Sequence, residues 1–250
     1  MSKAIVILDY NNVFCINHNL TTDKKKSIMN SLLRRIVAQN LTIDYVEIRY
    51  YGGWYNDKEL TRVGSQVMTD HLTMDLFPMR YGDCYIRGKQ VFVETITGTD
   101  YIWYNTYRER AGIPRFIINK GVRNDICDNN RTLCPIHILE SFSRKRERLC
   151  PVAGCTTNNE RAFIQMGQKM VDAMMVCDII SVSNVYKKEN IESIYVLTDD
   201  VDLFPAFAVC RNNASTMDIQ LGIINSKNVS LYEEYLKPFN IKVFQLYDYR

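Results

Sequence analysis

The sequence lacks the features that would place this protein in a membrane or a secretory route. No apolar run approaches the roughly 18 residues that a membrane-spanning helix needs. The N-terminus, MSKAIVILDY, has five apolar residues between Lys3 and Asp9, too few for a secretory signal. We therefore expect a cytoplasmic protein without a membrane partner.

Nucleotide-binding motifs, internal repeats and low-complexity linkers are also missing. Without a Gly-x-Gly-x-x-Gly or P-loop pattern, the sequence argues against a nucleotide cofactor. Hydrophobic residues make up 46% and charged residues 24%, which is ordinary for a globular chain. The net charge of +3 permits a polyanionic partner without requiring one.

What is present is an alternation of strands and helices. The apolar run at residues 4–8 predicts a strand that is buried on both faces. Residues 21–23 can cap a following helix, and residues 42–51 are expected to form a second strand. This order predicts an α/β fold, a three-layer Rossmann-like sandwich with a mainly parallel central sheet. The later elements are expected as a helix at 162–182, a strand at 194–197, a helix starting at 205–210, a strand at 219–224, a helix at 230–236 and a strand at 241–246.

The middle of the chain, roughly 54–160, follows this alternation less clearly. Strand signals at 90–96 and 113–118 stand beside a cluster of cysteines. We interpret residues 1–250 as one domain that carries a Cys-rich insertion at about 120–160.

Four carboxylates are expected at one edge of the sheet. Asp9 is the first polar residue after the first strand, and Asp200 and Asp202 follow the strand that ends near Leu197. Functional groups of open α/β sheets gather beyond the carboxyl ends of the strands. Asp172, in an apolar stretch of the expected helix, carries a charge that needs a partner.

Two further residues belong to the same segment. Lys169 is three positions before Asp172 and would share its helix face. Asp178 is six positions after Asp172, about 120° around a helix, and would support the site from further away. Carboxylates in such number suit Mg²⁺ or Mn²⁺, whereas any single Asp after a strand is more often a cap or turn former.

Three short motifs resemble those of the NYN-domain family, which are PIN-like metal-dependent ribonucleases. They are Asp9-Tyr-Asn-Asn12, Lys169-Met-Val-Asp172 followed by Asp178, and Thr198-Asp-Asp-Val-Asp-Leu-Phe-Pro205. Their order is also that of the family. The resemblance covers residues 1–53 and about 160–250.

The resemblance implies a role for each matching residue. Asp9, Asp172, Asp200 and Asp202 would bind Mg²⁺ or Mn²⁺, Asn12 and Thr198 would orient the ligands or the phosphate, and Asp178 would support them. Asp199 stands where the family has glycine, which adds negative charge and is expected to strain the turn; Leu203 replaces a phenylalanine. The gap before Lys169 is longer than usual, which fits an insertion.

A second candidate metal site lies in the cysteine cluster. Cys134, His137, Cys150 and Cys155 form two short pairs separated by 12 residues, a spacing that suits a structural Zn²⁺. Cys127 is an alternative to His137 as the fourth ligand. The competing interpretation is a set of unconnected buried thiols and a turn.

Basic residues near this cluster are candidates for RNA contact. Arginine and lysine bind phosphates without regard to sequence, although such runs are more often solvated helix faces. The candidates are Arg144, Lys145, Arg146, Arg148 and Lys169.

The sequence therefore predicts a nuclease that hydrolyses RNA, single-stranded or structured, and leaves single-stranded DNA open as a substrate. One alternative is a HAD-like phosphohydrolase, but Asn11 occupies the position of that family's proton-donating carboxylate. The other alternative is a non-catalytic RNA-binding module, which would have to retain clustered carboxylates beside a polyanion.

Overall fold

The computed structural model describes residues 1–15, 20–93, 106–111, 132–143, 147–150, 153–159, 164–168, 170–224 and 226–246. The chain divides into two compact units: a larger one, Met1–Thr106 with Gln168–Arg250, and a smaller one, Tyr107–Gly167. The range expected as an insertion, about 120–160, falls within the smaller unit. None of the helices in the described part of the chain is long and apolar enough to cross a membrane.

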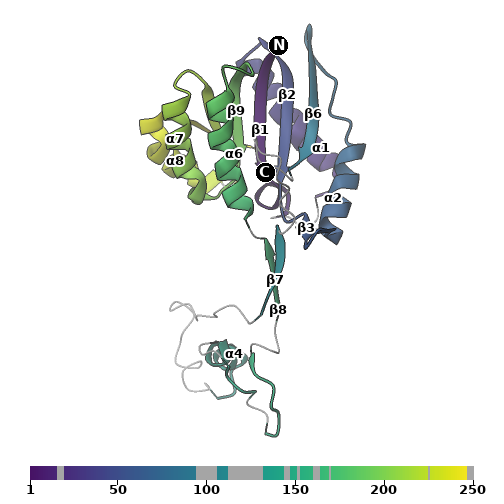
Figure 1. Ribbon diagram of the computed structural model, residues 1–250, viewed down its shortest axis with the longest axis vertical. Helices are drawn as coiled ribbons and strands as arrows, with labels where there is room; N and C mark the ends of the chain where they lie inside the picture. Colours follow the sequence, from purple (N-terminus) through teal and green to yellow (C-terminus); the bar gives the residue numbers. More distant parts are fainter. Residues whose placement is uncertain are drawn as a thin grey trace. The chain divides into compact units, whose positions relative to one another are not determined.

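The described residues of the larger unit form a seven-stranded sheet (Figure 1). Its order is β11-β10-β9-β1-β2-β6-β5. All neighbours pair in parallel except β5, which is antiparallel to β6. The strands are β1 (Ser2–Asp9), β2 (Ile43–Tyr51), β5 (Met79–Tyr81), β6 (Cys84–Phe92), β9 (Ile191–Leu197), β10 (Asp218–Ile223) and β11 (Lys242–Gln245).

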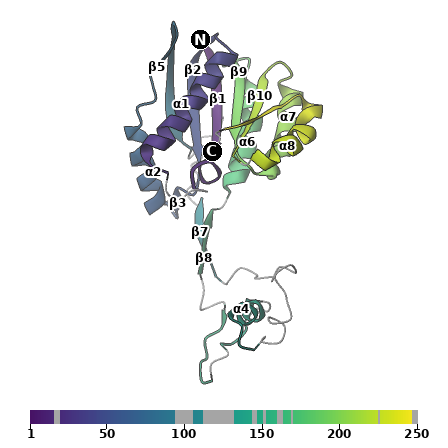
Figure 2. The same cartoon turned by 180° about the vertical axis from the view of Figure 1, so that it is seen from behind.

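Helices cover both faces of this sheet. Helix α6 lies in front of the sheet in Figure 1, and α1 lies in front when the view is reversed in Figure 2. The result is an α/β fold with a mostly parallel sheet, compatible with the predicted Rossmann-like sandwich. The helices of the larger unit are α1 (Thr22–Gln39), α2 (Arg62–Thr73), α6 (Val171–Val185), α7 (Phe204–Asn213) and α8 (Val229–Leu236).

The side chains of β1 divide between two hydrophobic cores. Ala4, Val6 and Leu8 belong to the core beneath α1, whereas Ile5 and Ile7 belong to the core shared with α6, α7 and α8. All five are fully buried. Burial on both faces explains why this strand is an unbroken apolar run, as expected for the centre of a parallel sheet.

Local signals mark several element boundaries as predicted. The Thr21 hydroxyl accepts a hydrogen bond from the backbone N–H of Lys24 at 3.4 Å and caps α1. Pro205 lies in the first turn of α7, where its missing N–H has no intrahelical partner to lose.

The helix predicted over 162–182 is wrong in its first part. Residues Ile164–Gln168 form a strand, β8, which pairs with β7 (Tyr107–Ala111). Met170 has a left-handed backbone with φ of 63°, and α6 begins only at Val171. Pairing with a strand more than 50 positions earlier decides this segment, and that partner is invisible to local periodicity.

The smaller unit contains one described helix, α4 (Pro135–Ser143), followed by a hairpin. In this hairpin, residues 148–150 pair with residues 157–159. The backbone N–H of Cys150 donates to Thr157 O at 2.8 Å, and that of Asn159 donates to Arg148 O at 2.9 Å. The predicted strand at 113–118 and the end of the one at 90–96 lie outside the described residues.

Candidate functional site

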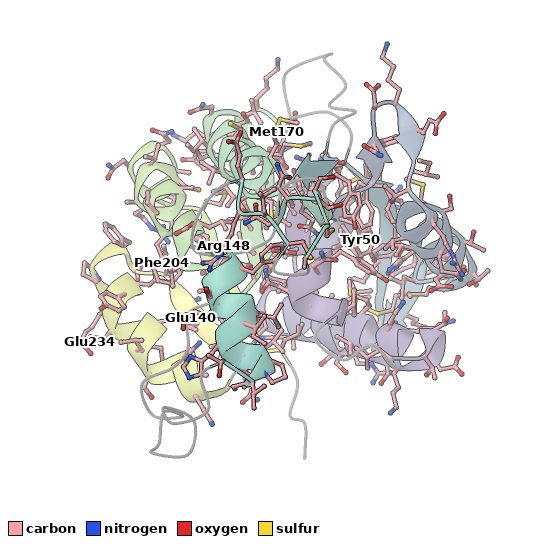
Figure 3. All side chains as sticks on the ribbon, turned by 90° about the horizontal axis from the view of Figure 1, so that it is seen from below. Tyr50, Glu140, Arg148, Met170, Phe204 and Glu234 are labelled. Carbon is pink, nitrogen blue, oxygen red and sulfur yellow. The ribbon has the colours of Figure 1, made fainter. Side chains whose placement is uncertain are left out.

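The strand order reverses at β1, and the candidate site lies at the carboxyl end of this strand. From β1 the sheet continues through β2 and β6 on one side and through β9, β10 and β11 on the other. Ligands of open α/β sheets bind beyond the carboxyl ends of the strands at such a switch point. Leu8 and Leu197 are register partners, so β1 and β9 end side by side. Figure 3 views the molecule from this end of the strands.

Asp9 ends β1 with a carboxylate that is almost fully buried. Its Oδ1 accepts hydrogen bonds from the backbone N–H groups of Asn11 and Asn12, both at 3.1 Å. The side-chain amide of Asn12 donates to its Oδ2. Burial raises the pKa of Asp9, the hydrogen bonds oppose this, and the negative charge of Asp200 raises the pKa further. Asn12 therefore orients Asp9, consistent with the role that the motif implies.

The turn after β9 carries the next two carboxylates. Thr198 is fully buried, and its hydroxyl accepts a hydrogen bond from the backbone N–H of Asp200 at 3.1 Å. Asp200 in turn caps a short 3₁₀ helix, Val201–Leu203, because its Oδ1 accepts from the backbone N–H of Asp202 at 2.9 Å. This chain of short contacts fixes the direction in which Asp200 leaves the sheet.

Asp172 completes the cluster from the first turn of α6. It follows Met170, the left-handed residue before the helix (Figure 3), and its side chain is exposed. Burial raises its pKa first, followed by the negative charges of Asp200, Asp9 and Asp202. A helix N-terminus normally favours a carboxylate, yet burial together with the neighbouring charges raises the pKa of Asp172. Asp172 is thus near enough to feel the charges of the three other carboxylates that the sequence singled out.

Asp199 precedes Asp200 in the turn after β9, but its hydrogen bonds are structural. Its Oδ1 accepts a hydrogen bond from the backbone N–H of Ile224, at 2.8 Å, just beyond β10. Its carbonyl accepts one from the Tyr232 hydroxyl at 3.0 Å. Asp199 therefore ties the turn to β10 and α8. The expected strain is absent, since Asp199 is not among the described residues with a left-handed backbone.

Asp178 is buried against β2. Both of its oxygens lie 2.7 Å from Arg49 Nη1, and its Oδ2 accepts a hydrogen bond from the Tyr51 hydroxyl at 2.5 Å. Tyr51 is the register partner of Asp9. Asp178 thus supports the site by fixing α6, which carries Asp172, to the strand beside β1.

Sequence reasoning missed the charged residues of β2. Arg49 Nε also donates to Glu47 at 2.8 Å, and Lys3 Nζ lies 3.1 Å from the same carboxylate. Burial raises the pKa of Glu47, but the charges of Arg49 and Lys3 outweigh it and lower the pKa to about 2. The sequence did contain a signal for this pair: Glu47 and Arg49 are two positions apart in an otherwise buried strand, which places their side chains on the same face.

The remaining predicted residues belong to the segment around the smaller unit. Arg148 is exposed, and its Nη1 donates to Ser141 O at 2.5 Å. Cys134, Cys150 and Cys155 are half-buried free thiols. Hydrogen bonds to the Cys155 sulfur from Thr157 and Cys150 lower its pKa. Five residues that the sequence analysis named lie outside the described part: Cys127, Arg144, Lys145, Arg146 and Lys169.

The acidic cluster suits an open cation site better than a closed cage. Within the described residues, no three His, Cys, Asp or Glu side chains are grouped so that they could hold a metal ion. Mg²⁺, however, keeps several of its waters and is usually bound by one or two carboxylates. Burial is the main cause of the raised pKa values of Asp9 and Asp172, and neighbouring carboxylates raise them further, a repulsion that a cation would offset. The residues therefore fit a water-rich Mg²⁺ or Mn²⁺ site.

Comparisons with known proteins add no family to this description. No protein-family model, curated protein or solved structure matches the chain. Its function must therefore be inferred from the site itself.

Proposed function

We propose that this protein is a Mg²⁺- or Mn²⁺-dependent nuclease, related in design to the NYN-domain and PIN-like ribonucleases, that hydrolyses RNA phosphodiester bonds. The observation that carries the proposal is the position of Asp9 and Asp200 after the paired strands β1 and β9 at the switch point of the sheet, with Asp172 close enough that both charges, after burial, help to raise its pKa. Several negative charges lie at the edge of the sheet where ligands of α/β proteins bind. Such a site favours a divalent cation that in turn binds a phosphate.

The protein's part in this chemistry is to hold oxygen ligands in fixed directions. Asp9 is immobilised by burial and by Asn12, and Asp200 is held by the turn through Thr198. A bound divalent cation would polarise the phosphate of the substrate and lower the pKa of a bound water. Asp172 and Asp202 are the exposed members of the cluster and so can meet solvent and substrate directly.

The HAD-like alternative is weaker at the same site. Such an enzyme needs a carboxylic acid two positions after the first aspartate to donate a proton. Here that residue is Asn11, whose backbone N–H is bonded to Asp9 Oδ1 at 3.1 Å. An amide side chain cannot supply the proton, and no described contact provides a substitute donor.

The test is RNA cleavage by the full-length protein with Mg²⁺ or Mn²⁺, using single-stranded and structured RNAs and an EDTA control. Asp200→Asn removes one charge of the cluster at nearly constant volume and should reduce cleavage at least 100-fold, about 2.7 kcal/mol of transition-state stabilisation. Asp199→Asn is the matched control, because it makes the same change one residue away and its amide oxygen can still accept from Ile224.

Three outcomes are distinguishable in this experiment. Metal-dependent cleavage that is lost in Asp200→Asn and kept in Asp199→Asn supports the proposal. Equal losses in both variants would indicate a disturbed turn and remove the evidence for a catalytic role of Asp200. Intact RNA with the folded, metal-loaded wild-type protein would overturn the nuclease assignment, and single-stranded DNA and phosphomonoesters would then be the next substrates.

A further inference from the structure

The first turn of α4 presents two metal-binding side-chain types on one face. Cys134 precedes the helix, and its carbonyl accepts the first helical hydrogen bond, from Ile138 N–H at 3.0 Å. His137 is three positions later, and helical residues three apart lie on the same side.

The environment of His137 is unusual for a packing residue. Its side chain is 10% exposed, and its Nδ1 lies 3.7 Å from the buried carboxylate of Glu140 (Figure 3 labels Glu140 on α4). The other ring nitrogen, Nε2, is buried and has no hydrogen-bond partner among the described residues. An unpaired buried nitrogen destabilises a fold. Metal-binding histidines commonly turn one nitrogen to a carboxylate and leave the other for the metal.

The hairpin 148–159 carries a pair of thiols. The side chains of Cys150 and Cys155 are within hydrogen-bonding contact of each other, and Thr157 also donates to the Cys155 sulfur. Gly154 has a φ of 82°, a left-handed conformation that a residue with a side chain would adopt only with strain. This glycine lets the chain turn tightly enough to return Cys155 towards Cys150.

Hydrogen bonds fix the base of this hairpin to the end of α4. Arg148 Nη1 donates to Ser141 O at 2.5 Å, and Asn159 Nδ2 donates to Phe142 O at 2.6 Å. Cys150 is two strand residues beyond Arg148, and His137 is about one helical turn before Ser141. Each is therefore roughly 6 Å along its element from the Arg148–Ser141 hydrogen bond, which holds the helix and the hairpin next to each other.

We propose that Cys134, His137, Cys150 and Cys155 bind one structural Zn²⁺ that joins α4 to the hairpin. Zinc takes four tetrahedral nitrogen and sulfur ligands, and these side chains supply one nitrogen and three sulfurs. Since no three of the described side chains are yet grouped to hold an ion, binding must draw the first turn of α4 onto the thiol pair. The thiols give up their protons to solvent on binding, with no change of oxidation state.

The test measures zinc by elemental analysis in the full-length protein after exhaustive dialysis. We expect one Zn²⁺ per chain in the wild type and in Asp200→Asn, which excludes the acidic cluster as the site. His137→Ala and Cys155→Ser should lose it, whereas His137→Cys, which keeps a zinc ligand at this position, should retain it. Cys177→Ser, which alters an exposed cysteine on α6, is the matched control and should also retain it.

A second measurement does not depend on variants that fold poorly. Co²⁺ added to metal-free wild type should give the visible absorption of tetrahedral thiolate coordination, and Zn²⁺ should displace it. The proposal is overturned by wild type that binds neither ion, by His137→Ala that retains full zinc, or by a disulfide between Cys150 and Cys155 in protein purified without oxidant.

Discussion

Arg49 of β2 and Asp178 of α6 form an ion pair in which Arg49 Nη1 lies 2.7 Å from both carboxylate oxygens. The Asp178 side chain is fully buried and that of Arg49 is 11% exposed. The pair therefore joins a strand of the central sheet to the helix that positions Asp172.

Breaking this pair should destabilise the protein strongly. Asp178→Ala leaves Arg49 with Glu47 alone to balance its charge and removes the acceptor of the Tyr51 hydroxyl, so we expect the free energy of unfolding to fall by about 3 kcal/mol in denaturant titrations. Arg49→Met combined with Asp178→Leu removes both charges and should cost clearly less than the single change. Lys242→Ala, in an exposed pair with Asp218, is the control and should cost about 1 kcal/mol or less. A double variant no better than Asp178→Ala would contradict this account.

His71 should make stability depend on pH in the acid range. Its ring is packed among aromatic side chains, neither ring nitrogen has a hydrogen-bond partner in the described structure, and burial lowers its pKa from 6.5 to about 4. The unfolded chain protonates His71 more readily than the folded chain does. The contribution of the neutral His71 ring to stability is therefore fully present above pH 6.5 and is lost as the pH falls towards 4.

The measurement is unfolding of wild type and His71→Phe across this window. Each pKa unit corresponds to about 1.4 kcal/mol, so wild type should lose on the order of 3 kcal/mol more than the variant between neutral pH and about pH 4. The comparison uses the slope of the free energy of unfolding against pH, so a packing cost of phenylalanine that does not depend on pH cancels. Parallel curves would show that His71 titrates alike in the folded and unfolded states.

Charge repulsion in the acidic cluster should be visible without substrate. In EDTA, Asp172→Asn relieves repulsion and should raise Tm by about 1–3 °C, because the residue is exposed and the gain stays below about 1 kcal/mol. Mn²⁺ should raise the Tm of wild type and have a smaller effect on Asp200→Asn. Asp199→Asn should respond to Mn²⁺ like wild type. An equal Mn²⁺ effect on Asp200→Asn would place the bound cation elsewhere.

Gly88 should tolerate no side chain. A Cβ at this position would lie 2.3 Å from the carbonyl oxygen of Val46 on β2 and 2.6 Å from the ring of Phe77. The β2–β6 pairing fixes the backbone atom, so Gly88→Ala must separate two paired strands, and we expect a loss of about 1–3 kcal/mol or more. Arg87→Ala, a neighbouring change on an exposed side chain of the same strand, should cost much less.

Local signals were enough to predict much of the sheet. The buried run at residues 4–8, the cap at Thr21 and the proline in α7 each report a constraint that acts on neighbouring residues. The nearness of Asp9 and Asp200 was also predictable, because parallel strands bring their carboxyl ends to one edge whatever the distance along the chain. Asp9 and Asp200 are 191 positions apart and still meet there.

What failed depended on distant partners. The strand β8 forms because β7 pairs with it, and the apolar character of 162–182 alone favoured a helix. The supporting role expected of Asp178 is still a prediction, but its spacing from Asp172 could not identify its principal contact, Arg49, which is 129 positions away. Spacing identifies which helical residues share a face, but it cannot name the strand residue on which that face packs.

The pairing of β1 with β9 also bears on the order of synthesis. Strand β1 leaves the ribosome first, but its neighbour on this side is not complete until Leu197, and Asp200 and Asp202 follow it. During translation, β1 therefore has no neighbour on this side until residues 191–197 have been added. The carboxylates of the acidic cluster are therefore complete only after the turn that follows β9 has been made, and a product that ends before β9 lacks both Asp200 and Asp202.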